Sequence, residues 1–93
     1  MNVASMVFAV LLCLFSNVYA ADPEFEGECP MGLSEGKQVA TDCSVFWVGP
    51  DDKLYCFFNQ AAKEQFLLSP KENLTRAQTF WDSENLKKLI RRE

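Results

Sequence analysis

The stretch from Thr41 to Phe66 contains two short apolar segments separated by a turn, and it constrains the fold more than any other feature. Both segments are rich in β-branched and aromatic residues, which favour strands, and we place these strands at Gln38–Val48 and Lys53–Phe58. Between them, Gly49–Asp52 consists of residues typical of turns. The pattern predicts a β-hairpin with one cysteine in each strand.

The length of the turn predicts how the two strands pair. A four-residue loop sets Val48 opposite Lys53, so that Cys43 and Cys56 share a face but lie diagonally to each other. Diagonal Cα atoms are about 7–8 Å apart, near or beyond the roughly 7 Å that a disulfide spans. This register argues against a Cys43–Cys56 bridge without excluding it.

Helical signals follow the hairpin. Asn59 is a good N-cap for a helix predicted at Gln60–Leu68, whose residues favour helix. Ser69 then stops this helix and caps the next one, with Pro70 at the first helical position and Glu72 completing a capping box.

The rest of the chain continues in helices. Apolar residues recur at helical spacing in the second helix, and Asp82 or Ser83 is expected to cap a last one. We therefore predict an α+β fold, a small domain in which a β-hairpin is followed by two or three short helices. A single aromatic core is expected from Trp47, Phe57, Phe58, Phe66, Phe80 and Trp81.

The first twenty residues are predicted to be a signal peptide. They contain an apolar run without a charged side chain before Asp22, and Val18-Tyr19-Ala20 ends in small residues suited to cleavage after Ala20. The run is short for a membrane helix, so we expect no stable membrane span after cleavage. The protein is thus predicted to be secreted or periplasmic.

The remaining residues form one small domain preceded by an arm. Residues 21–37 are acidic and interrupted by glycine and proline, which predicts an irregular arm, and residues 38–93 form the domain. The formal net charge is −4, which argues against a nucleic-acid surface. The acidic arm and the basic C-terminal tail are candidate docking patches for a protein partner in the cell envelope.

Without the signal peptide, three cysteines remain: Cys29, Cys43 and Cys56. An odd number allows at most one internal disulfide and leaves one thiol, so the chain is expected as a monomer or a disulfide-linked dimer. The chain contains no histidine, which removes the usual general base and the commonest zinc ligand. No pair of carboxylates suggests acid–base chemistry, so we expect no catalytic residues and no enzyme activity.

The sulfur atoms offer two alternatives. Cys29, Met31, Cys43 and Cys56 are soft ligands, which together predict a Cu(I) site. The other alternative is structural and has two forms. In one, Cys29 forms a disulfide with Cys43 or Cys56 that ties the arm to the domain, and the third cysteine is a small buried apolar residue. In the second form, all three cysteines are unbridged core residues.

An aromatic pattern spans the hairpin and the first helix, within Val39–Pro70. It consists of Asp42, Tyr55, Phe57, Phe66 and Ser69-Pro70. This pattern resembles the YHS domain, a small metal-associated module related to the TRASH domains. The resemblance implies an exported domain linked to the handling of heavy metals, often copper.

The chain departs from the family's metal-binding pattern. Two of the family's ligand cysteines correspond to Phe58 and Ala62, neither of which binds a metal. Cys56 stands where the family has the second aromatic residue of its strand. The favoured function is still binding of a soft metal, Cu(I) first, in delivery, buffering or sensing. The alternative is a metal-free structural or protein-interaction module of the cell envelope held by one disulfide.

Overall fold

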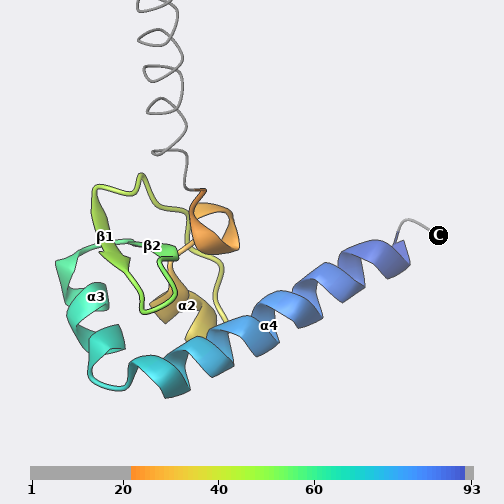
Figure 1. The fold of residues 1–93 in the computed structure, drawn as a ribbon. Helices are drawn as coiled ribbons and strands as arrows, with labels where there is room; N and C mark the ends of the chain where they lie inside the picture. The colour runs from red at the N-terminus through yellow and green to blue at the C-terminus, as the bar shows by residue number, and fades with distance from the viewer. Residues whose placement is uncertain (1–21, 92–93) are drawn as a thin grey trace, which may run out of the picture.

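The computed structural model describes residues 22–91, and the predicted signal peptide lies outside them. These residues form a small α+β domain, as predicted, in which an antiparallel hairpin is surrounded by helical segments (Figure 1). In Figure 1 the last helix runs past the other elements and leaves the body of the domain. The elements are η1 (Glu24–Gly27), α2 (Pro30–Ser34), β1 (Val45–Val48), β2 (Leu54–Phe57), α3 (Gln60–Leu67) and α4 (Pro70–Arg91).

The hairpin is present, but its register differs by one residue from the prediction. Val48 pairs with Leu54 instead of Lys53. The Gly49 N–H donates to the Lys53 carbonyl at 2.8 Å, and Asp52 takes a left-handed conformation with φ 59°. Gly49 and Lys53 therefore also pair, and the loop between them consists of the three residues 50–52. A tight turn that ends in a left-handed residue accounts for the shifted register.

The predicted irregular arm contains two helical segments that belong to the core. Pro30 occupies the first turn of α2, where its missing N–H costs nothing, and α2 packs against α4. Leu33 is fully buried, and Phe25 in η1 is nearly so. The Cys29 N–H donates to the Val39 carbonyl at 2.8 Å, which ties α2 to the segment before the hairpin. The prediction of an irregular arm treats proline and glycine as interruptions of regular structure. In the fold, Gly27 ends η1 and Pro30 begins α2.

The two helices after the hairpin start where predicted, but the second is longer than predicted. The helix α3 starts as expected, with the Asn59 side chain accepting a hydrogen bond from the Ala62 N–H at 2.8 Å. The helix α4 is continuous over 22 residues, so the predicted break at Asp82 or Ser83 is wrong. Asp82 instead accepts a hydrogen bond from Gln78 one turn earlier, a pair that stabilises the helix.

The predicted aromatic core is confirmed in part. Phe57 and Phe66 are buried, with ring centroids 5.3 Å apart, while Trp47, Phe80 and Trp81 are partly buried against them. Phe58 is 63% exposed, because it follows the end of β2 in the bend before α3. The core contains, instead of Phe58, residues from η1, from α2 and its N-cap, and from β2. The buried core residues are Phe25, Cys29, Met31, Leu33, Tyr55, Phe57, Phe66 and Ala77.

No helix within residues 22–91 has both the length and the apolar character needed to cross a membrane.

Candidate functional site

Cys43 and Cys56 form a disulfide, so the argument from register against this pair was wrong. Their Cα atoms are 4.7 Å apart. Cys43 lies outside β1 and has φ 60°, because Asp42 forms a side-chain turn in which its Oδ1 accepts hydrogen bonds from the Ser44 N–H (3.0 Å) and hydroxyl (2.7 Å). These hydrogen bonds lower the pKa of Asp42. The turn folds Cys43 back onto β2, where Cys56 is fully buried.

This pairing separates the four predicted sulfur ligands. In the disulfide, Cys43 and Cys56 are not thiolates and cannot bind Cu(I) as such. Cys29 is a free, buried cysteine beside α2, and Met31 is buried in α2. Across residues 22–91, no cluster of three or more cysteine, aspartate or glutamate side chains is arranged to hold a metal ion.

Cys29 and Met31 do line one hollow, with a volume of about 320 Å³. Phe58 and Ala62 line the same hollow, and these are the positions of two ligand cysteines in the YHS pattern. The arm therefore brings two sulfur-bearing residues beside positions where the resemblance places metal ligands.

A second hollow lies between the hairpin loop and the start of α4, and we call it the aromatic groove. Its central feature is the pair Trp47 and Tyr55, which face each other across the strands with stacked rings 5.5 Å apart. Gly49 is buried beside this pair, where an added Cβ would lie 2.9 Å from the Tyr55 ring. The groove has a volume of about 280 Å³ and is lined by Trp47, Pro50, Asp51, Tyr55, Pro70, Lys71 and Leu74.

Polar groups lie at the rim of the aromatic groove. Desolvation raises the pKa of Tyr55, and the negative charges of Glu24 and Asp51 raise it further. Glu24 lies outside the groove lining and forms an ion pair with Lys53 at 3.7 Å, in which both side chains are exposed. With Lys71 contributed by α4, the groove combines an apolar floor with charges of both signs, an arrangement typical of binding sites.

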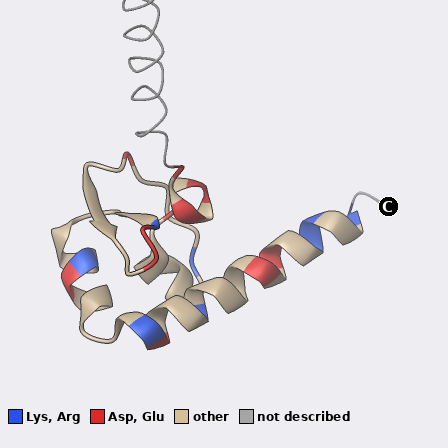
Figure 2. Cartoon of the chain, viewed as in Figure 1, with Lys and Arg blue, Asp and Glu red and all other residues tan. Residues whose placement is uncertain are grey.

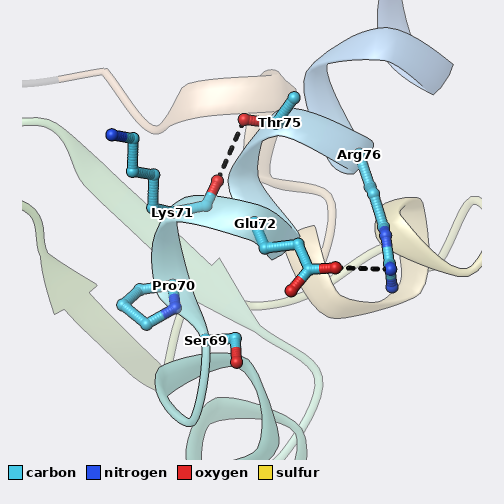
Figure 3. Close-up of a pocket in the computed structure, with 6 residues that line it drawn as sticks. All are labelled: Ser69, Pro70, Lys71, Glu72, Thr75 and Arg76. Atoms are coloured by element: carbon cyan, nitrogen blue, oxygen red, sulfur yellow. Dashed lines mark hydrogen bonds and ion pairs between the residues drawn. The ribbon is translucent and has the colours of Figure 1, made fainter.

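A broader depression adjoins the groove at the first turns of α4 (Figure 3). Two interactions join polar groups that line it: the Arg76 guanidinium lies 2.6 Å from the Glu72 carboxylate, and the Thr75 hydroxyl donates to the Lys71 carbonyl at 3.0 Å. Figure 3 shows Lys71 extending away from this pair. Glu72 thus pairs with Arg76 in this depression and does not show the predicted capping-box role.

No protein-family model matches the chain, and no characterised protein or solved structure is significantly similar to it. The resemblance to the YHS domain therefore stays a prediction.

Sequence reasoning missed the aromatic groove. The predicted register, with Val48 opposite Lys53, sets Trp47 opposite Leu54, whereas the observed register pairs Trp47 with Tyr55. The two prolines that line the groove were visible in the sequence, one in the turn and one at a helix start. Only the packing of α4 beside the hairpin brings them together.

Proposed function

We propose that this protein is a non-enzymatic protein-interaction module, exported to an oxidising compartment and held by one disulfide. The aromatic groove carries this proposal. Grooves lined by aromatic side chains bind extended, proline-containing peptide segments, whose apolar residues lie against the rings. The groove lies between the disulfide-linked hairpin and the first turns of the long helix α4.

We favour peptide binding over metal binding because of how the sulfur atoms are arranged. A site of four sulfur ligands requires Cys43 and Cys56 as free thiolates, and these residues are joined to each other. The partly buried Trp47, supported by the buried Tyr55 ring, is in contrast a residue type that dominates the energetics of protein interfaces.

Selection of a displayed peptide library on the oxidised protein tests the groove. We expect enriched peptides with a shared apolar or proline-containing motif, whose affinity falls about 30-fold or more in Trp47→Ala. Phe46→Ala is the matched control, because Phe46 is the neighbouring strand residue, is 51% exposed and lies outside the groove. Leu74→Asp, which changes the opposite wall, should give a loss similar to that of Trp47→Ala.

Each variant is first checked for the disulfide and for helical circular dichroism, so that loss of binding is not loss of fold. Peptides that bind Trp47→Ala and wild type equally, or that lose affinity in Phe46→Ala, would refute the assignment of the groove.

Binding of Cu(I) is the second candidate, now restricted to Cys29 and Met31. It is supported by the hollow that both residues line and by the preference of thiolate and thioether ligands for Cu(I). The affinity and stoichiometry of Cu(I) binding are measured on the oxidised protein by anaerobic titration in competition with a Cu(I) chelator. Stoichiometric binding that is lost in Cys29→Ala and weakened in Met31→Leu would support the site. Equal copper uptake by Cys29→Ala would eliminate it.

A further inference from the structure

The two walls of the aromatic groove carry opposite charges. Pro50 and Asp51 come from the hairpin loop, and Pro70 and Lys71 come from the first turn of α4. Each wall thus presents a proline followed by one charged residue, and both charged side chains are exposed. Figure 2 shows acidic residues on the hairpin loop and a basic residue at the start of α4. A ligand in the groove therefore meets a negative group on one side and a positive group on the other.

The hairpin side of the groove has an excess of negative charge. Lys53, which follows the loop, is paired with Glu24, whereas Asp51 and Asp52 form no ion pair within residues 22–91. Desolvation raises the pKa of Tyr55 most, and the charges of Glu24 and Asp51 raise it further, so their negative potential reaches a ring that lines the groove. A positively charged side chain of a ligand is favoured on this side.

The α4 side of the groove has an available positive charge. Arg76 is already bound to Glu72 at 2.6 Å, and Lys71 is the charged residue of α4 that lines the groove. Figure 3 shows Lys71 extending away from the Glu72–Arg76 pair, and Lys71 forms no ion pair within residues 22–91. The positive end of the helix dipole lies in the same turn. A negatively charged side chain of a ligand is favoured on this side.

Ordered backbone positions the two charged residues. Asp51 lies in the tight turn that is closed by a 3.0 Å hydrogen bond from the Asp52 N–H to the Gly49 carbonyl. Lys71 lies in the first turn of α4, directly after Pro70, whose ring fixes φ. The groove thus holds one charge of each sign on separate elements, with the apolar floor between them.

We propose that the aromatic groove selects extended peptide segments in which an apolar or proline residue stands between a basic and an acidic side chain, with the basic one at Asp51 and the acidic one at Lys71. This inference rests on the peptide binding proposed above and names the class of peptide. A few placed polar groups give a pocket its specificity, and complementary charges add specificity and association rate more than affinity. A peptide with two charges of the same sign meets one repulsive wall.

Selection from one displayed library of random peptides on three oxidised proteins tests the proposal. The wild type should enrich peptides with one basic and one acidic residue around the apolar anchor. Lys71→Glu should enrich peptides with two basic residues, and Asp51→Lys should enrich peptides with two acidic residues, because each change makes the two walls alike. This expectation does not depend on the direction in which the peptide lies.

Glu35→Lys and Lys37→Glu are the matched controls. They change the net charge by the same amounts at exposed positions outside the groove, and they should enrich the same peptides as the wild type. Helical circular dichroism and the disulfide are checked first in every variant.

Binding kinetics of the most enriched wild-type peptide measure the size of the effect. Asp51→Asn and Lys71→Gln should each lower the affinity about threefold at low salt, mainly through a slower association rate. The loss should shrink at high salt, because exposed charges are screened.

The outcomes separate this inference from the proposed function. Peptides that require Trp47 but carry the same charges in all three selections would overturn the inference and leave peptide binding standing. A change of charge preference in Glu35→Lys or Lys37→Glu would show that net charge, and not the groove, selects the peptides, and would also overturn it. Enrichment of no peptide that requires Trp47 would overturn both proposals.

Discussion

Glu28 is a residue whose charge opposes folding. Its Oε1 atom is buried without a hydrogen-bond partner among residues 22–91. Burial raises the pKa of Glu28, the charge of Lys88 lowers it by less, and Glu26 raises it slightly. Because the pKa is higher in the folded than in the unfolded state, the ionised carboxylate reduces stability at neutral pH, and this cost disappears when the group is protonated in both states.

Replacing Glu28 by glutamine tests this interpretation. We expect Glu28→Gln to raise the melting temperature at about pH 7 and to leave it unchanged near pH 3, because glutamine resembles the protonated carboxyl. Thermal unfolding followed by circular dichroism across this pH range measures the difference. Glu35→Gln, at an exposed position, should change little at either pH. A less stable Glu28→Gln at pH 7 would mean that the carboxylate has a stabilising partner.

The pairing and the disulfide of the hairpin depend on the backbone conformation of two residues that lie outside its strands. The left-handed Asp52 sets the register, and the left-handed Cys43 sets the disulfide. Both are non-glycine residues at positive φ, which is uncommon and favoured for aspartate by its short polar side chain. A sequence pattern based on alternation of side chains contains no signal for either.

Removing the disulfide should weaken the domain without changing its fold. The bridge closes a loop with a sequence separation of 13, so Cys43→Ser/Cys56→Ser should lose about 3 kcal/mol in free energy of unfolding. The fold should persist because the buried side chains around Phe57 and Phe66 do not depend on the bridge. Urea unfolding of both proteins under non-reducing conditions measures this loss.

Cys29→Ala is the control, since Cys29 is unpaired and its replacement leaves the bridge intact. Peptide mapping should find Cys43 linked to Cys56 in this variant. A bridge that includes Cys29 in the wild type would contradict the structure.

At the scale of the whole molecule, the domain closes only with its N-terminal segments in place. Phe25 lies against Tyr55 and Trp81, with ring centroids 6.2 and 5.7 Å away, and so connects η1 with the hairpin and with α4. The helix α2 packs against α4 and α3. A chain of this size buries a smaller fraction of its surface than a larger domain does, so the apolar residues of the arm are needed to complete the core.

The local elements were determined by the sequence itself. The hairpin, the Asn59 cap of α3 and the start of α4 at Pro70 follow from short-range preferences of turn, cap and strand residues, and they stand where predicted. The α+β class follows from the same signals.

The tertiary structure alone decided the pairing of Cys43 with Cys56, the burial of the arm and the aromatic groove. Each depends on contacts between residues distant in the sequence, or on a backbone conformation that the packed chain stabilises. The four predicted sulfur ligands therefore lie in two places: Cys43 and Cys56 in the disulfide, and Cys29 and Met31 at the start of α2. A sequence shows which residues carry sulfur. Whether two cysteines form a disulfide or are free to bind a metal depends on the distance between them in the fold, here 4.7 Å between the Cα atoms of Cys43 and Cys56.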